Sequence, residues 1–308
     1  MLIVNNEQAY NNNQLFRYIP KKFRRALYFI EMDGLEEIRL RQGLPVMLYY
    51  TEGQFFLSPK GHLQTTAENA LTAVKQDIQE GLELISGSSI YAVEHELRKG
   101  YITISGGHRV GICGTAVETE QGIGTIKDIS GLNYRISREC VGISDKLMDG
   151  IMRGGEVLNT LIISPPQCGK TTLLRDIVRN ISNRGRKVSL VDERSELAAM
   201  SNGYQGYDLG MSCDVLEGAL KSEGMLLMLR SMSPEVVVTD ELGDVRDIAA
   251  VAKIIHSGVS VISTVHCRNR EELLKRPDMQ KLASYFDCFI TLSRRNGVGT
   301  VEEVYCAL

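Results

Sequence analysis

Mostly apolar runs alternate with amphipathic stretches along the second half of the sequence, from Glu156 onward. Runs of this length are typical of strands that are buried on both faces of a parallel sheet. We expect strands at residues 158–164, 188–191, 236–239, 259–264 and 289–292. Residues 171–181 gather their apolar side chains on one helical face. The pattern therefore predicts strands that alternate with crossover helices.

The chain ends in two more strand patterns, residues 288–295 and 300–308, around turn residues Asn296 and Gly297. This pair predicts a hairpin that closes the sheet.

The first half has a different texture, with a helical stretch at residues 67–85 among short, turn-rich pieces. These pieces are residues 35–50, 99–117 and 129–140, and we expect them to form a small mixed sheet. Three glycines follow in "MDGIMRGGE", residues 148–156, which suits a linker. We therefore predict an N-terminal mixed α/β domain at residues 1–148 and a second domain at residues 149–308.

Composition and charge narrow the class of protein to which the chain can belong. With 308 residues, 43% of them hydrophobic, the chain is long enough for two domains. The net charge of −3 provides no overall positive field for nucleic acid or membranes. No apolar run approaches the roughly 18 residues of a membrane span, and the N-terminus does not have the pattern of a signal peptide. We expect a cytoplasmic protein whose seven scattered cysteines are reduced thiols.

The stretch "LIISPPQCGKTTLLRD" places Gly169, Lys170 and Thr171 between an apolar strand and an amphipathic helix. This is the context of a phosphate-binding loop, in which backbone N–H groups and the lysine hold phosphates and the threonine contacts magnesium. Ser164 replaces the first glycine of the pattern, which we expect to be tolerated because close approach is needed at Gly169. The alternative is an ordinary strand-turn-helix corner with an exposed lysine. The expected ATP contacts are Pro166, Gln167, Cys168, Gly169, Lys170, Thr171 and Thr172.

Polar residues also follow three other predicted strands, at the carboxyl edge where open α/β sheets bind ligands. "PEVVVTDEL" ends in Asp240, suited to hold Mg through water, and Glu241, suited to polarise the attacking water. "VSLVDERSEL" delivers Glu193 and Glu196 to the same edge. "VSVISTVHC" delivers His266, which either senses the γ-phosphate or is satisfied by neighbouring backbone.

Together, "SPPQCGKTTLLRD", "VDERSEL", "LRSMSPEVVVTDELGD" and "STVHC" resemble the ATPases of the type II and type IV secretion superfamily. By that resemblance, Glu193 or Glu196 belongs to an acidic box, Asp240 and Glu241 to the magnesium-binding strand end, and His266 to a histidine box. The resemblance implies a RecA-like P-loop NTPase domain with a mostly parallel sheet. Where these ATPases usually carry Gly-Glu the chain has Asp240-Glu241, so the division of work between Glu241 and the acidic box stays open.

A more specific resemblance, carried also by "EIRLRQGLPV", "GGHRVGICGTAV" and "ISGLNYRISRE", is to the stage III sporulation AA family of endospore-forming bacteria. It implies a homo-hexameric ring, recruited to the membrane by membrane-bound components of a sporulation channel. Arginines of the N-terminal domain, Arg135 and Arg138, would then reach nucleotide at a subunit edge, and Arg230 is a further candidate. Surface salt bridges are the alternative for each arginine.

These features favour an ATP-hydrolysing motor of a sporulation channel, with ATP and Mg as cofactors. The alternative is a P-loop ATPase acting on nucleic acid, although the chain has no tryptophan and only 6% aromatic residues for base stacking. A third possibility is a scaffold that binds nucleotide without turnover.

Overall fold

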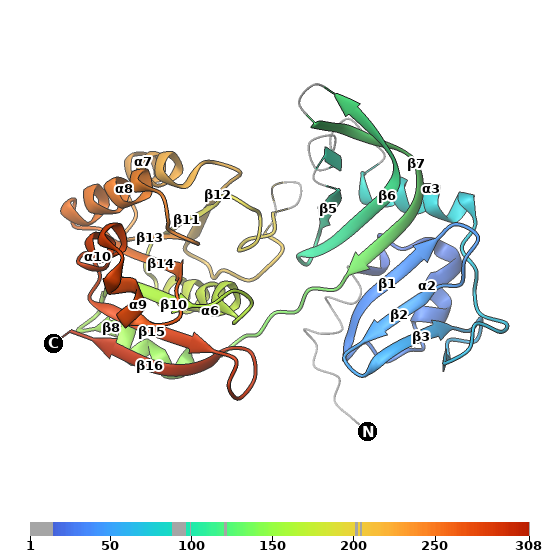
Figure 1. Ribbon diagram of the computed structural model, residues 1–308, viewed down its shortest axis with the longest axis horizontal. Helices are drawn as coiled ribbons and strands as arrows, with labels where there is room; N and C mark the ends of the chain where they lie inside the picture. The colour runs from blue at the N-terminus through green and yellow to red at the C-terminus, as the bar shows by residue number, and fades with distance from the viewer. Residues whose placement is uncertain are drawn as a thin grey trace. The chain divides into compact units, whose positions relative to one another are not determined.

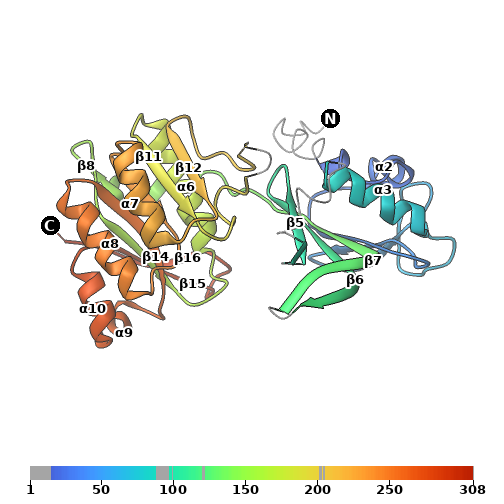
Figure 2. The same cartoon turned by 90° about the horizontal axis from the view of Figure 1, so that it is seen from above.

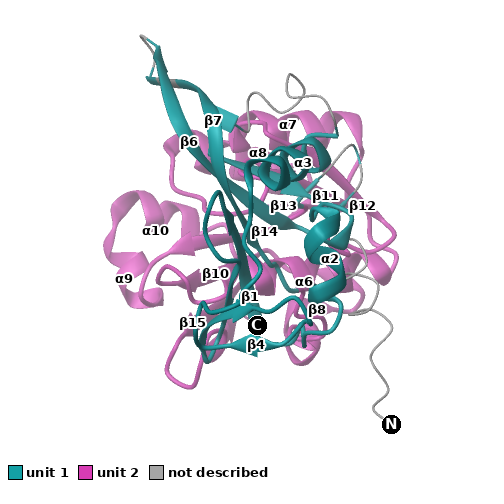
Figure 3. Cartoon of the chain, turned by 90° about the vertical axis from the view of Figure 1, so that its right-hand side faces the viewer, with its two compact units in different colours: residues 1–138, 199–206 teal, residues 139–198, 207–308 magenta. Residues whose placement is uncertain are grey.

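The structure is a computed structural model that describes residues 15–87, 97–98, 100–119, 122–200, 203 and 205–307. It divides into two compact units, one of residues 1–138 with 199–206 and the other of residues 139–198 with 207–308 (Figure 3). The N-terminal stretch, for which the sequence predicts no signal peptide, lies outside the described residues. None of the described helices is long and apolar enough to cross a membrane.

The first unit is built on a sheet of seven strands in the order β4-β3-β2-β1-β7-β6-β5. Figure 2 shows helices α2 (Lys21–Leu27) and α3 (Lys75–Ile85) on one face of this sheet. The apolar side chains of both helices join the core beneath them, as Phe23 and Ile78 do. The strands are β1 (Leu35–Arg41), β2 (Met47–Tyr50), β3 (Gly53–Leu57), β4 (Leu63–Gln64), β5 (Tyr101–Ile104), β6 (His108–Thr119) and β7 (Gly122–Arg135).

The prediction of a small mixed sheet in the first half is wrong. Every pairing between neighbouring strands of this seven-stranded sheet is antiparallel among the described residues. The long hairpin of β6 and β7 supplies much of it, and β7 then pairs with β1, far earlier in the chain. Alternating patterns predict strands, but they do not predict which strands pair.

The second unit holds a sheet in the order β12-β11-β13-β14-β10-β15-β16, in which only β16 pairs in the antiparallel sense (Figure 1). Its strands are β10 (Thr160–Ser164), β11 (Val188–Asp192), β12 (Cys213–Glu217), β13 (Val236–Thr239), β14 (Ser260–His266), β15 (Cys288–Ser293) and β16 (Thr300–Cys306). Its helices and short elements are η2 (Asp145–Leu147), α5 (Met148–Ile151), β8 (Met152–Arg153), β9 (Glu156–Val157), α6 (Lys170–Asn183), α7 (Lys221–Ser231), α8 (Val245–His256), α9 (Arg270–Lys275) and α10 (Pro277–Ala283).

Helices cover both faces of this sheet, which explains why its inner strands are apolar throughout. In β10 all five residues are buried. Leu161 and Ile163 belong to the core under α7 and α8, while Ile162 points to the opposite face, which α6 covers. Asp244 caps α8 by accepting the N–H of Arg246 at 2.8 Å, which fixes where the chain re-enters a helix after β13.

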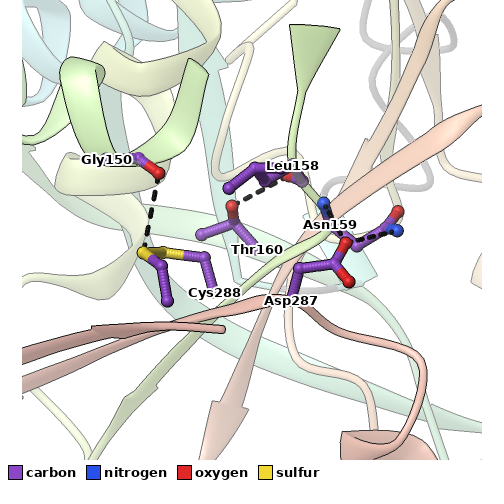
Figure 4. The surroundings of a disulfide bond; sticks show 7 residues. Gly150, Leu158, Asn159, Thr160, Asp287 and Cys288 are labelled. Atoms are coloured by element: carbon purple, nitrogen blue, oxygen red, sulfur yellow. Dashed lines mark hydrogen bonds between the residues drawn. A yellow bond between two sulfur atoms is a disulfide. The ribbon is translucent and has the colours of Figure 1, made fainter. Parts of the chain in front are cut away.

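The hairpin of β15 and β16 forms as predicted, but the expectation that all cysteines are reduced is wrong for two of them. Cys288 and Cys306 face each other across the hairpin, with Cα atoms 4.0 Å apart, and are joined by a disulfide (Figure 4). The two cysteines are 18 residues apart in the sequence, and only the register of β15 and β16 shows that they lie opposite each other. In the same region Asn159 donates its side-chain N–H to Asp287 at 2.9 Å, which ties the start of β10 to the start of β15.

Candidate functional site

The loop of residues 164–171 joins the end of β10 to the first turn of α6. Gly169 is the N-cap of α6 with φ of 83°, and Gln167 has φ of 59°, so both lie in the left-handed region. Glycine adopts this conformation freely, whereas a side chain there is strained. This tight turn leaves the first N–H groups of α6 without helical partners at the carboxyl edge of the sheet, an arrangement that attracts anions.

Ser164 has a specific role in this loop. The residue is fully buried, and its hydroxyl donates to the carbonyl oxygen of Pro165 at 2.8 Å. Its Oγ also accepts a hydrogen bond from Nζ of Lys170 at 3.3 Å. A glycine at this position would offer the lysine only its carbonyl oxygen, so the serine adds a second acceptor to the lysine's site.

Lys170 turns its ammonium group back toward the loop and is only 6% exposed. Nζ donates to the carbonyl oxygens of Pro165 at 3.1 Å and Ser164 at 3.3 Å, and lies 3.0 Å from Nδ1 of His266. Burial lowers the pKa of Lys170, while the nearby Glu241 carboxylate opposes that shift. All these direct acceptors are neutral, so a phosphate oxygen would be a stronger partner for the ammonium.

His266, the last residue of β14, connects Lys170 to Glu241. An ammonium group has donors only, so Nδ1 of the imidazole must accept and the proton must sit on Nε2. Nε2 then donates to Oε1 of Glu241 at 2.7 Å. The register of the parallel strands β10 and β14 brings His266 to Lys170, because Ser164 at the end of β10 lies opposite His266.

Glu241 is held from several sides. Its N–H donates to Oγ1 of Thr264 at 2.9 Å, and its Oε2 accepts from Arg194 at 2.7 Å. Its φ of 43° is unusual for a residue with a side chain and costs of order 1–3 kcal/mol. Burial alone would raise the pKa of Glu241, but the hydrogen bond from His266 and the charges of Arg194 and Lys170 lower it overall. The carboxylate is therefore ionised and oriented.

Asp240 lies beside it with a different environment. The residue is 2% exposed, and its Oδ1 has no hydrogen-bond partner among the described residues. Burial, helped by Asp192 and other carboxylates, raises the pKa of Asp240 to about 6, against the opposing charge of Lys221. A buried polar oxygen without a partner is rare, and a carboxylate oxygen is a preferred ligand of Mg²⁺. Asp240 and the hydroxyl of Thr171 are oxygen donors of the kind that Mg²⁺ prefers.

Asp192 organises the acidic segment that follows β11. Its carboxylate accepts the backbone N–H groups of three residues at 2.8–2.9 Å, and these residues are Glu196, Leu197 and Ala198. Glu193 forms an ion pair with Lys221 at 3.0 Å, and the carbonyl oxygen of Glu196 accepts from Arg175 at 2.8 Å. The described contacts thus link Glu241, rather than Glu193, to the lysine of the loop through His266.

The three candidate arginines contact groups near them in sequence or within their own unit. Arg135 lies 3.8 Å from the carboxylate of Glu37, and Arg138 donates to the carbonyl oxygen of Leu35 at 3.1 Å. Arg230 donates to the carbonyl oxygen of Leu226, one turn earlier in α7, at 3.0 Å. A role at the nucleotide therefore stays a prediction for each of them.

Sequence reasoning missed Arg194 and Lys221, although Arg194 lies inside the quoted segment "VDERSEL". The residue types alone did not indicate a role at the site, because an arginine or lysine beside acidic residues is common on protein surfaces. Only the fold shows that Arg194 reaches Glu241 and that Lys221 is buried beside Glu193.

A family model described as "Sporulation stage III, protein AA" matches residues 9–307 of the chain. The chain belongs to this family. Stage III sporulation protein AA of Bacillus subtilis (strain 168) is 39% identical over 304 residues, which cover 95% of this chain and 94% of that protein. Protein SEEDLING PLASTID DEVELOPMENT 1 of Arabidopsis thaliana is 29% identical over 156 residues, 50% of this chain and 22% of that protein. The resemblance drawn from the motifs is confirmed.

Solved structures of two bacterial ATPases, DotB and the pilus retraction motor PilT, share the fold. The Legionella pneumophila ATPase DotB is 16% identical with a TM-score of 0.56, over 89% of this chain and 76% of that chain. The pilus retraction motor PilT, solved with bound ADP, is 14% identical with a TM-score of 0.59, over 89% of this chain and 80% of that chain. The chain therefore has an α/β fold similar to the folds of these two ATPases.

Proposed function

We propose that the chain is the ATP-hydrolysing motor of a sporulation secretion apparatus and that it binds ATP with magnesium at the 164–171 loop. The observation that carries the proposal is the connected set of Lys170, His266 and Glu241. These residues lie at or just after the ends of three different strands, yet their side chains meet at one sheet edge with contacts of 2.7 and 3.0 Å. A cation for phosphate and an oriented carboxylate at one edge are the parts that phosphoryl transfer needs.

Each residue has a stated task in this proposal. Residues 166–172 supply backbone donors to the phosphates, and Lys170 exchanges its neutral acceptors for β- and γ-phosphate oxygens. Asp240 and Thr171 would hold a magnesium ion, which when bound would neutralise charge on the phosphates. Glu241 accepts a hydrogen bond from the attacking water and so orients it toward the γ-phosphorus. His266 positions Glu241 through its Nε2 and contacts Lys170, which lies beside the γ-phosphate, through its Nδ1.

The acidic segment has a supporting part. Glu193 and Glu196 belong to a loop that Asp192 holds by three backbone hydrogen bonds. We assign the positioning of water to Glu241 because it is the glutamate joined through His266 to Lys170.

The family match supports a proposal for assembly and partners as well. We propose a homo-hexameric ring in the mother-cell cytoplasm that membrane-bound channel proteins recruit, with Arg135 and Arg138 acting at subunit edges. ATP would favour one arrangement of the domains and ADP another, so that hydrolysis drives motion.

The test combines ATP binding, phosphate release and molar mass by light scattering, with ATP and magnesium present. We expect the parent to bind ATP, assemble and release phosphate, and Lys170→Ala to lose ATP affinity at least tenfold. Lys253→Ala, which changes an exposed lysine on α8, is the matched control and should behave like the parent. A parent that binds no ATP contradicts the proposal, and hydrolysis that requires single-stranded nucleic acid would favour the alternative class of ATPase.

A further inference from the structure

The turn between β15 and β16, residues 294–299, lies against the 164–171 loop. A Cβ atom built on Gly169 would lie 3.3 Å from Cγ1 of Val298 and 3.4 Å from both Cα and N of Gly299. The φ of 83° favours glycine at position 169, and the close approach of the turn leaves little spare room for a side chain there. The turn comes more than 120 residues later in the chain but forms one wall beside the loop.

Sheet order explains why the two segments meet. β10 pairs in parallel with β14 on one side and with β15 on the other. The carboxyl ends of these strands share one edge, so the turn after β15 emerges beside the loop after β10. His266 ends β14 and Glu241 comes shortly after β13, so both lie on the opposite side of β10 from this turn.

This placement favours one direction for a bound nucleotide along the sheet edge. If the γ-phosphate meets Glu241 and His266, the α-phosphate, sugar and base extend away from them, toward β15 and its turn. This step rests on the proposed function, because it takes the ligand to be a nucleoside triphosphate.

The chemistry of the turn suits that part of the ligand. Val298 is 61% exposed, an apolar side chain between two glycines. Arg294 and Arg295 add positive charge, although Arg295 already pairs with Glu302 at 3.3 Å. The turn is held by its own hydrogen bonds, since Oγ1 of Thr300 donates to the carbonyl oxygen of Gly297 at 2.8 Å. An ordered turn that presents a bare apolar group can cover a sugar or base face at low entropic cost.

We propose that the β15–β16 turn is the nucleoside-binding element of the site, with Val298 packing against the sugar or base of the bound nucleotide. The phosphates contact the 164–171 loop, and the turn contacts the rest of the ligand. Val298 thus distinguishes a nucleotide from a bare polyphosphate.

The experiment compares equilibrium binding of ATP and of inorganic triphosphate, both with magnesium, by titration calorimetry. Val298→Ser should weaken ATP binding about fivefold, as expected for losing roughly half of a buried valine contact, and leave triphosphate binding unchanged. Val301→Ser is the matched control, because Val301 is 40% exposed on β16 beyond the turn, and it should change neither affinity.

Unchanged ATP affinity in Val298→Ser overturns the inference, and so does equal weakening for both ligands, which would mean that the loop itself was disturbed. In both cases a parent that binds ATP leaves the proposed function standing. A parent that binds neither ligand overturns the proposed function and this inference with it.

Discussion

Replacing Asp240 with asparagine should stabilise the protein while removing the carboxylate that we propose as a magnesium ligand. The carboxyl group is 2% exposed, and Oδ1 has no hydrogen-bond partner in the part of the chain that the structure describes. Burial, with help from the charge of Asp192, raises its pKa from 3.8 to about 6. Folding therefore makes this group harder to ionise, and at neutral pH its charge opposes the folded state.

The magnitude follows from the shift in pKa. Between pH 3.8 and about 6 the folded chain binds more protons than the unfolded chain, so the free energy of unfolding falls as pH rises through this window. A shift of about two pKa units corresponds to about 3 kcal/mol at pH 7 and above. Asparagine is close in size and carries no charge, so we expect Asp240→Asn to gain up to about 3 kcal/mol at pH 8, about 1 kcal/mol at pH 4.5 and almost nothing at pH 3.

Urea unfolding followed by circular dichroism at pH 8, 4.5 and 3 measures this gain. Asp149→Asn, a substitution of an exposed aspartate on α5, is the matched control and should change stability by less than about 0.5 kcal/mol at every pH. Asp240→Asn should also lose magnesium-dependent phosphate release. The reasoning is refuted if the variant is no more stable than the parent at pH 8, or if its gain is as large at pH 3 as at pH 8.

Three further substitutions test other parts of the account. His108→Asn keeps an acceptor for the N–H of Ser137 but cannot be protonated as histidine can. Burial lowers the pKa of His108 to about 4, so the parent should lose about 3 kcal/mol of unfolding free energy through this group as pH drops from 6.5 to 4, and the variant should not. Equal pH dependence of the unfolding free energy in urea for parent and variant would contradict this. His266→Ala should lower kcat for ATP hydrolysis about 100-fold, because Glu241 loses the donor that orients it; a kcat within twofold of the parent in steady-state phosphate release would refute the role. Arg194→Ala should move the acid limb of the pH–kcat profile to higher pH, because the charge of Arg194 helps to lower the pKa of Glu241, and a superimposable profile would count against it.

The inner strands of the second unit could be predicted because burial on both faces leaves a plain signal. β10, β11 and β13 are buried at every position, and their apolar runs are visible in the sequence. β12 was missed because it lies at the edge of the sheet, where burial is partial and Asp214 and Glu217 interrupt the pattern. A run of apolar residues identifies a central strand, and an edge strand lacks that run.

The site could be predicted only at the level of residue types and strand ends. The sequence placed Lys170, Asp240, Glu241 and His266 at one sheet edge because parallel strands share their carboxyl edge. It did not predict that His266 bridges Lys170 and Glu241, because that contact depends on the register that sets Ser164 opposite His266. Likewise, the choice among three glutamates depended on side-chain directions that only the fold provides.

The most direct test of the central claim asks which glutamate orients the attacking water. Single-turnover phosphate release and ATP affinity should be measured side by side for Glu241→Gln, Glu193→Gln and Glu196→Gln. We predict that Glu241→Gln binds ATP like the parent but releases phosphate at least about 100-fold more slowly, while the other two variants stay within about tenfold of the parent. Parent-like hydrolysis by Glu241→Gln, together with a loss in Glu193→Gln or Glu196→Gln, would contradict it.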